Sequence, residues 1–307
     1  FPAEMAENRE MTAKIKSLNL YTADMAEQWA SKHPADEVTF GDSSQGGIVG
    51  ETVTEKDENG KDVKVYRINE LGMALGKNYD DPQWTEVLNR ITLGEMQNLV
   101  LHGYTQTYAV NSIGKPATLD LDGPNQIGSF SGSVAYRITG FSSIVLALSW
   151  NAHLAYSMGL TIVNECWQAS VSGWYGPGIN VHRSPFGGRN YEYYSEDAYL
   201  SGVMCAKTIE AAKNKGVFSW LKHICLYETE SGRDGMYTWL TEQALREIYL
   251  KPFEIAVKDG GATAIMTSYG RIGAVWTGGS EALLTELVRN EWGFKGINIT
   301  DSSKDAS

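Results

Sequence analysis

The sequence predicts an α/β protein whose main part is a (β/α)8 barrel of the TIM type. Short apolar runs rich in β-branched residues alternate with longer segments of helical period. The apolar runs end on polar or charged residues that can bind a hydroxyl group or a charge. A barrel of this type places its site at the carboxyl ends of its strands, so the order of the segments and their chemistry agree.

Five apolar runs are expected to be strands of this barrel. The runs are residues 117–121, 178–181, 216–221, 262–267 and 292–301, the last of which is entered through a glycine turn. The polar side chains at or just after their ends are Asp122, His182, Lys222, His223, Ser268, Tyr269 and Asp301. Helices are expected over residues 150–168, 238–258 and 280–292. The first of these helices has a stripe that should face the core, made of Leu154, Met158, Ile162 and Cys166.

The expected domain organisation is a linker and helical approach segment over residues 1–80, followed by the barrel domain over residues 81–307. Helix formers dominate residues 3–32. Thr92 and Glu95 have the Thr-x-x-Glu spacing of a capping box, which should begin a helix. The 307-residue chain stops shortly after Asp301 and does not begin with Met, so we expect a barrel that is incomplete at its C-terminus, within a longer protein.

Composition excludes several classes of function. Lys and Arg number 26 against 37 Asp and Glu, a net charge of −11, so no nucleic-acid partner is expected. The 3 cysteines lack metal-ligand spacing and predict neither a disulfide framework nor a zinc site. No metal and no cofactor are expected. The sequence has no run of 18 apolar residues and no signal peptide, which favours a cytoplasmic location.

Asp301 is the first candidate for the reacting group. It ends an apolar run that begins after a glycine turn, and a barrel strand holds such a carboxylate at the rim. Strands also end in Asp because Asp initiates turns well, so the position alone leaves both interpretations open.

The densest chemistry lies in residues 182–197, which read HRSPFGGRNYEYYSED. These side chains need partners or a wet cleft, because an unpaired buried charge costs several kcal/mol. Pairing of Arg183 or Arg189 with Glu192 or Asp197 accounts for part of the segment. The remaining donors, together with 16 Tyr and 9 Trp in the chain, suit the hydroxyl groups and the apolar face of a sugar.

Six segments together resemble glycoside hydrolase family 3, the β-glucosidase and β-xylosidase family. The family carries a DGP turn, an HR-x-P-x-x-GRN segment that continues to SED, a KHF strand end, an E-x-x-LREIYL-x-PFE helix, an MTSYNR strand and a GF-x-G-x-x-x-[ST]-D strand. The matching segments, in family order, are residues 122–124, 182–197, 222–224, 242–254, 266–271 and 293–301. The joint match covers roughly residues 84–301 and is highly specific.

The resemblance implies a retaining glycoside hydrolase that cleaves terminal β-linked glucose or xylose through a covalent glycosyl-enzyme intermediate on Asp301. The residues that it places around the sugar are Asp122, Arg189, Lys222, His223 and Tyr269, with Glu230 and Trp276 as secondary candidates. We expect the cationic Lys222 and Arg189 to lower the pKa of Asp301 and keep it ionised.

The general acid is expected outside this chain. A retaining glycosidase needs a second carboxyl group about 5 to 5.5 Å from the nucleophile. The resemblance places this group on a Glu of an α/β sandwich domain, which we expect as a partner of the barrel. The expected substrate is a β-glucoside or an oligosaccharide, and the sequence leaves homo-oligomer formation open.

Departures from the family pattern lead to an alternative. Many relatives read KHFALN-[DN]-QE where residues 222–230 read KHICLYETE, although the final Glu230 is retained. Gly270 stands where the family usually has Asn. The alternative function is therefore a catalytically impaired barrel that binds sugar without hydrolysing it.

Two other enzyme classes differ in their reacting group. A branch of the same family acts on N-acetylglucosamine and uses a His on the loop after the KH strand, but residues 225–230 contain no His. A Schiff-base aldolase would use Lys222 as its nucleophile, as desolvated lysines on barrel strands do. Borohydride trapping with a carbonyl substrate distinguishes the aldolase.

Overall fold

The structure is a computed structural model. It describes residues 52–56, 59–66, 74–75, 78, 80–89, 91–128 and 140–302. The helical approach segment expected within residues 1–80 lies largely outside these described residues, and the domain boundary expected at residue 80 stays a prediction. The chain divides into two compact units, one from Asn19 to Leu119 and one formed mainly by Asp120–Ser307.

The first unit contains a hairpin and two short helices. Strands β1 (Thr52–Lys56) and β2 (Asp62–Tyr66) pair antiparallel, and helices α4 (Trp84–Asn89) and α5 (Leu93–Leu101) follow. The capping box expected at Thr92 and Glu95 is confirmed, with the side chain of each residue bonded to the backbone of the other. After α5, strand β3 (Gln106–Thr107) and the 3-10 turn η2 (Asn111–Ile113) lead into the next strand.

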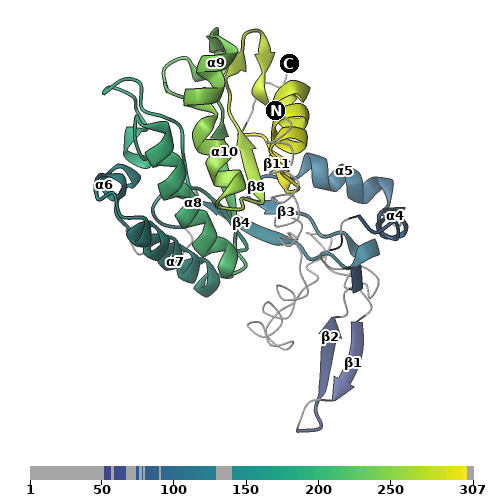
Figure 1. The fold of residues 1–307 in the computed structure, drawn as a ribbon. Coiled ribbons are helices and arrows are strands. Elements are labelled where there is room, and N and C mark those ends of the chain that lie inside the picture. The colour runs from purple at the N-terminus through teal and green to yellow at the C-terminus, as the bar shows by residue number, and fades with distance from the viewer. Residues whose placement is uncertain are drawn as a thin grey trace. The chain divides into compact units, whose positions relative to one another are not determined.

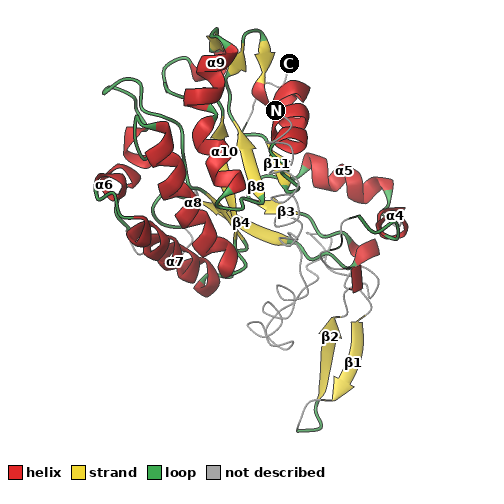
Figure 2. Cartoon of the chain, viewed as in Figure 1, coloured by secondary structure: helices red, strands yellow, loops and turns green. Residues whose placement is uncertain are grey.

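The second unit is built on a parallel sheet whose strands follow one another in space as in the chain (Figures 1 and 2). The parallel strands, in this order, are β4 (Thr118–Asp122), β5 (Gly173–Tyr175), β6 (Phe218–Ile224), β8 (Ala264–Thr267) and β11 (Ile297–Ile299). Helices lie between consecutive strands in the chain. The α/β class and the TIM-type arrangement are confirmed, and among the described residues the sheet is open.

The helices between the strands are α6 (Ser143–Leu148), α7 (Ala152–Gln168), α8 (Ala198–Asn214), α9 (Glu242–Ala244), η5 (Leu245–Tyr249), α10 (Lys251–Lys258) and η7 (Ala282–Glu291). The segments η5 and η7 have the wider π-type hydrogen bonding. Helix α8 packs between α7 and α10 beside the sheet, as Figure 1 shows. Gly159 permits the close approach of α7 to α8, since a Cβ there would lie 2.6 Å from the carbonyl oxygen of Thr208.

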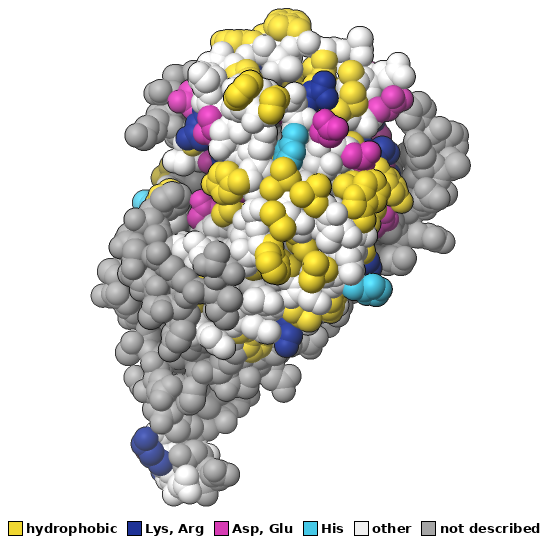
Figure 3. Space-filling view, turned by 90° about the vertical axis from the view of Figure 1, so that its left-hand side faces the viewer, with side chains coloured by type: hydrophobic (Ala, Val, Ile, Leu, Met, Phe, Trp, Pro, Cys, Tyr) yellow, Lys and Arg dark blue, Asp and Glu magenta, His cyan; other side chains and the backbone are white. Residues whose placement is uncertain are grey.

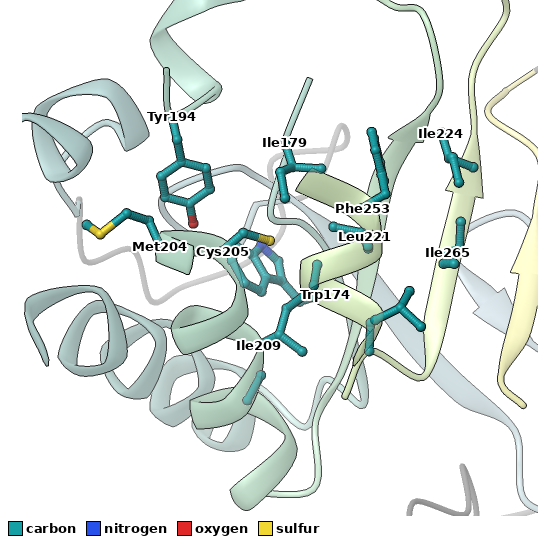
Figure 4. Packing of buried hydrophobic residues seen from close by; sticks show 14 of the residues in the cluster. Trp174, Ile179, Tyr194, Met204, Cys205, Ile209, Leu221, Ile224, Phe253 and Ile265 are labelled. Carbon is teal, nitrogen blue, oxygen red and sulfur yellow. The ribbon is translucent and has the colours of Figure 1, made fainter. Parts of the chain in front are cut away.

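Strand β6 is buried along its whole length, so its two faces contact different apolar layers. Leu221 and Ile224 belong to the cluster between the sheet and the helices, which Figure 4 shows together with Trp174, Ile209 and Phe253. Trp220 is the neighbour of Leu221 along the strand, and its ring packs edge-on against Tyr175 and Phe218. Its indole N–H donates to Asp120 Oδ2 at 3.1 Å, which satisfies this fully buried carboxylate.

The stripe expected on the helix over residues 150–168 is confirmed in three of its four positions. Met158, Ile162 and Cys166 are buried in α7, whereas Leu154 in the first turn is 38% exposed. The other two thiols are buried as well, Cys205 in α8 and Cys225 just after β6. The three cysteines therefore come from three different segments but belong to the same core cluster.

The strand expected over residues 178–181 was wrong in position. The structure places β5 at Gly173–Tyr175, and the peptide bond that follows joins Gly176 to Pro177. Proline has no N–H to donate to a neighbouring strand, so regular pairing stops there. The ladder resumes only as a bridge, in which the Ile179 N–H donates to the Lys222 carbonyl oxygen at 2.9 Å.

The helix expected over residues 238–258 begins later, at Glu242, where the Thr241 side chain accepts a hydrogen bond from Ala244 N–H. The preceding residues form β7 (Tyr237–Thr238), which pairs with β9 (Arg271–Ile272) in a small three-stranded sheet completed by β10 (Val275–Trp276). This sheet lies outside the barrel order and connects two segments that follow barrel strands.

Apolar side chains gather on the outer face that carries α6 and α7, which Figure 3 views directly. The exposed apolar residues of this segment are Phe141, Val145, Leu148, Trp150 and Leu154. Within the described ranges, none of the helices has both the length and the apolar composition needed to span a bilayer.

Candidate active site

The candidate site lies where the parallel strands end. Asp122 ends β4, Lys222 and His223 lie near the end of β6, Tyr269 follows β8, and Asp301 follows β11. Because these strands are parallel, their carboxyl ends meet at one edge of the sheet. Contacts among these side chains show that the structure brings these five residues together.

Lys222 and Asp122 form an ion pair across neighbouring segments of this edge. The Lys222 Nζ atom lies 2.6 Å from Asp122 Oδ1, and its side chain is only 3% exposed. Burial acts to raise the pKa of Asp122, but attraction by the Lys222 ammonium and hydrogen bonds from Lys222 and Gly123 outweigh it and lower the pKa. The pair therefore places a hydrogen-bond acceptor and a hydrogen-bond donor side by side at this edge.

His223 is fully enclosed and neutral. Burial, and then the nearby cations Arg189, Lys222 and Arg233, hold the pKa of this imidazole well below its usual value of 6.5. Its Nδ1 atom lies 3.2 Å from the hydroxyl of Tyr193, and its Nε2 atom lies 3.5 Å from Asp301 Oδ2. Since the ring is neutral, the contact with Asp301 is not an ion pair, and Nε2 is directed at the carboxylate.

Asn180 fixes the backbone of His223 from the adjacent segment. Its amide group donates to the His223 carbonyl oxygen at 3.0 Å and accepts from the His223 N–H at 2.9 Å. The extended chain after Pro177 brings Asn180 to this position. The two hydrogen bonds leave the imidazole with little freedom to shift along the strand.

Arg189 enters the site from the segment that precedes the 3-10 turn η3 (Asn190–Glu192). Its Nε atom donates to the buried carboxylate of Glu192, and its Nη1 atom lies 3.6 Å from Glu230 Oε1. The expected pairing of Arg189 with Glu192 is thus confirmed. Glu230 also accepts a hydrogen bond of 2.8 Å from Arg233 Nη1, so one carboxylate lies between two guanidinium groups.

The Asp301 carboxylate is held beside Tyr269. Asp301 Oδ1 accepts from the Ser302 N–H at 2.7 Å, and the Tyr269 hydroxyl donates to the Ser302 carbonyl oxygen at 2.6 Å. The expectation that cations lower the pKa of Asp301 was wrong. Burial raises this pKa above its usual value, and the opposing effects of the Ser302 N–H, Lys222 and Arg189 do not cancel it.

Trp276 is half-buried, and its ring is held next to the site by a hydrogen bond to the backbone. Its indole N–H donates to the Ser268 carbonyl oxygen at 3.1 Å, and a Cβ on Gly278 would lie 2.5 Å from the ring. Ser268 is itself bonded to the Cys225 carbonyl oxygen at 2.6 Å. Trp276 therefore anchors the segment that carries Tyr269 to the end of β6.

Tyr193, Tyr227, Arg233 and Asn180 are the residues of this site that sequence reasoning did not identify. Tyr193 was included only in the dense segment, without a role. The Arg233 guanidinium lies 4.7 Å from the centre of the Tyr269 ring. A signal for Arg233 was present, since it is the first cation after the KH strand in a segment rich in carboxylates.

Glu228 is a half-buried residue in the loop after β6, and its carboxyl oxygen Oε1 is enclosed. Burial raises its pKa from the ordinary 4.5 to about 7, against the opposing effects of backbone hydrogen bonds, the Asn180 amide and the Arg183 charge. One oxygen, Oε1, has no hydrogen-bond partner. The carboxyl group is therefore held in an environment that favours its neutral form.

Glu228 should make the stability of the protein depend on pH. Because its folded-state pKa is raised, the stabilisation is complete below about pH 4.5 and is lost as pH rises through about 7. Glu228→Gln cannot ionise, so at pH 8 it is expected to be more stable than the wild type by up to roughly 3 kcal/mol. Urea unfolding between pH 5 and pH 8 measures this difference. The exposed Glu196→Gln is the control, and parallel curves for wild type and Glu228→Gln would contradict the prediction.

The chemistry of the site suits a polyhydroxylated ligand. It combines a carboxylate that reaches solvent, with 17% of the Asp301 side chain exposed, with fixed cationic donors and a neutral imidazole. Charged donors and acceptors make shorter and stronger hydrogen bonds to hydroxyl groups than neutral ones. Within the described ranges, no cluster of three or more His, Cys, Asp or Glu side chains is suited to hold a metal ion.

Comparison with known proteins agrees with this chemistry. The family model described as "Glycosyl hydrolase family 3 N terminal domain" matches residues 104–306. The chain is 38% identical over 192 residues to a beta-glucosidase of Ruminococcus albus, covering 62% of this chain and 20% of that protein. It is 36% identical over 225 residues to an exo-alpha-(1->6)-L-arabinopyranosidase of Bifidobacterium breve, covering 70% of this chain and 30% of that protein.

Among solved structures, the chain is similar to beta-glucosidase 3B from Thermotoga neapolitana in complex with alpha-D-glucose. The TM-score is 0.66 with 32% sequence identity, over 71% of this chain and 33% of that one. The chain thus spans a fifth to a third of the length of these relatives.

Proposed function

Because this chain belongs to glycosyl hydrolase family 3, we propose that it carries the nucleophile and the sugar-binding groups of a retaining β-glycosidase. The proposed substrate is a terminal β-linked glucose or xylose. The observation that carries the proposal is the Asp301 carboxylate, which ends a barrel strand 3.5 Å from the neutral His223 and beside Tyr269. We call the full-length protein that contains this chain the parent protein.

In the proposed first step, an Asp301 oxygen attacks the anomeric carbon on the face opposite the β-linked leaving group. The bond from this carbon to the leaving oxygen breaks, and the leaving oxygen takes a proton from a general acid. In the second step, water attacks the same carbon, the ester bond to Asp301 breaks, and the acid's conjugate base takes the water's proton. Two inversions retain the β configuration.

The proposed sugar-binding groups divide by charge. Asp122 accepts hydrogen bonds from ring hydroxyl groups, whereas Lys222 and Arg189 donate to hydroxyl oxygens. His223 donates from Nε2 to a hydroxyl or to the Asp301 oxygen, because its other nitrogen faces Tyr193. The ion pair of Lys222 with Asp122 holds both groups in place before the sugar binds.

We place the general acid outside this chain, on a second domain of the parent protein. Glu192 is bonded to Arg189, and Glu230 lies between Arg189 and Arg233, so both carboxylates already have guanidinium partners. The pKa of Glu228 is raised to about 7, which suits a general acid near neutral pH. This observation favours Glu228 as a second candidate for the general acid. Its carboxyl group, however, is hydrogen-bonded to the Asn180 amide, which is itself bonded to the His223 backbone.

A mechanism-based label tests the proposed nucleophile. A 2-deoxy-2-fluoro-β-glucoside with a dinitrophenyl leaving group should inactivate the parent protein by leaving a stable fluorosugar ester. Mass spectrometry of the digest is expected to find that sugar on the peptide that contains Asp301. Label on another carboxylate would refute the assignment, and glucose binding without any turnover or label would favour the impaired, sugar-binding alternative.

The placement of the acid predicts that this chain alone hydrolyses alkyl β-glucosides very poorly. Departure of an alkoxide needs a proton, whereas dinitrophenolate leaves without one, so only a dinitrophenyl glucoside should be turned over measurably. Initial rates on the two substrates, for the chain and the parent protein, give the comparison. Full activity of the chain on an alkyl glucoside would show that Glu228 or Glu230 is the acid.

The sugar specificity is tested by comparing three nitrophenyl glycosides. One relative is named a beta-glucosidase and another an exo-alpha-(1->6)-L-arabinopyranosidase. An α-L-arabinopyranoside presents its leaving group in the same relative geometry as a β-D-galactopyranoside but lacks the C6 hydroxymethyl group. Ratios of kcat/KM for the nitrophenyl glucoside, xyloside and arabinopyranoside decide among them.

A further inference from the structure

Tyr227 occupies the centre of the candidate site without reaching solvent. It follows β6, lies in the loop between the strand and Arg233, and is 1% exposed. A side chain so enclosed cannot stack on a sugar ring. Its effect on the ligand must pass through the residues that it contacts.

The Tyr227 ring contacts four residues of the site, from four separate segments. It stacks on His223 with ring centres 4.6 Å apart and an angle of 25° between the planes. The Arg189 guanidinium lies 5.2 Å from the ring centre, and the Tyr269 ring lies 6.1 Å away. The hydroxyl group of Tyr227 accepts a hydrogen bond of 2.5 Å from Arg233 Nη1.

These contacts restrain groups that would otherwise move. Arg189 and Arg233 are both cations, and the Glu230 carboxylate contacts both and reduces their repulsion. The negative face of an aromatic ring stabilises a guanidinium by about 0.5 to 2 kcal/mol, depending on burial. Stacking also fixes the plane of the His223 imidazole, so that Nε2 stays directed at Asp301.

We propose that Tyr227 is a positioning residue that fixes His223 and Arg189 in the geometry required to bind ring hydroxyl groups of the substrate. This inference rests on the proposed function and adds to it a buried residue that orients the sugar-binding side chains. In this chain the orientation of both groups depends on the ring.

Substitution of Tyr227 in the parent protein separates the ring from the hydroxyl group. Tyr227→Leu removes both and is expected to lower kcat/KM for nitrophenyl β-glucoside about 30-fold. Tyr227→Phe keeps the stacking and should remain within about 5-fold of wild type, because it loses only the hydrogen bonds of the hydroxyl group to Arg233 and Arg189. Tyr194→Leu is the control, since Tyr194 is another buried tyrosine, bonded to Thr208 among the outer helices.

A second readout reports on hydroxyl binding itself. Nitrophenyl β-glucosides that lack one ring hydroxyl each are compared with the full substrate, in wild type and in Tyr227→Leu. If the ring positions His223 and Arg189, the penalty for at least one missing hydroxyl should shrink in Tyr227→Leu, because that contact is already lost. A residue that only stabilises the fold would lower all rates without changing these penalties.

The outcomes separate this inference from the function on which it rests. Loss of activity in Tyr227→Leu with a reduced deoxy penalty, and near-normal rates in Tyr227→Phe, supports the inference. Unchanged penalties, or equal effects of Tyr227→Leu and Tyr194→Leu, would overturn it while the fluorosugar label on Asp301 stands. A parent protein without glycosidase turnover overturns both. Thermal unfolding of each variant shows which ones are folded.

Discussion

Replacement of Asp301 with alanine in the parent protein is expected to lower kcat/KM for an aryl β-glucoside by about 10⁴-fold or more. Without the carboxylate, no covalent intermediate forms and no negative charge stabilises the positive charge that develops on the anomeric carbon. Azide should restore part of the rate with a dinitrophenyl glucoside. The product should be the α-glucosyl azide, since azide enters from the side that Asp301 occupied.

Two controls sharpen this result. Asp259→Ala removes an exposed carboxylate at the end of α10 and should leave kcat/KM unchanged. Because burial raises the pKa of Asp301, the acid limb of the wild-type kcat/KM profile should lie above the usual value for Asp. Turnover of Asp301→Ala at a wild-type rate without azide would exclude Asp301 as the nucleophile.

Replacement of Lys222 or Arg189 with alanine is expected to lower kcat/KM by roughly 10²-fold or more, which corresponds to about 3 kcal/mol of charged hydrogen bonding. Lys222→Ala also leaves Asp122 without its partner, so part of its effect could come from an unpaired carboxylate. Steady-state kinetics on nitrophenyl β-glucoside, with urea unfolding of the same variants, separate these contributions.

The paired substitution of Lys222→Met with Asp122→Asn removes both charges of that ion pair. It should recover stability relative to Lys222→Ala but not activity, because the substrate still lacks the cationic donor and the charged acceptor. Lys207→Ala on α8, where Lys207 pairs with Glu210 on the surface, is the matched control for a lost lysine. Near-normal kinetics in both Lys222→Ala and Arg189→Ala would show that the sugar site lies elsewhere.

The strand ends could be predicted from the sequence because the same local pattern serves folding and chemistry. In β6, for example, the apolar run that begins at Phe218 predicts a buried strand, and Lys222 and His223 lie near its carboxyl end, where the site is. Helix α8 was not predicted, since it packs against both α7 and α10 and has no single apolar stripe. Strand β5 was predicted at the wrong position because it has only three residues, Gly173–Tyr175, and such a short run gives no clear pattern in the sequence.

The electrostatics of the site depended on burial, which the sequence does not contain. Lys222 and Arg189 are close enough to attract Asp301, as expected, yet desolvation has the larger effect on its pKa. Similarly, nothing in the sequence placed Asn180 beside the His223 backbone, because that contact follows from the break in β5 at Pro177. Long-range contacts of this kind depend on the packed arrangement of segments that are distant in the chain.

The three buried cysteines can be used to measure partial opening of the folded protein. Cys166, Cys205 and Cys225 are each 0% exposed, and burial raises the pKa of the Cys205 and Cys225 thiols, so the reactive thiolate is scarce as well as shielded. Alkylation should therefore proceed only through transient openings. Because these thiols lie in α7, in α8 and after β6, separate alkylation rates would show whether the helical layer opens before the sheet or together with it.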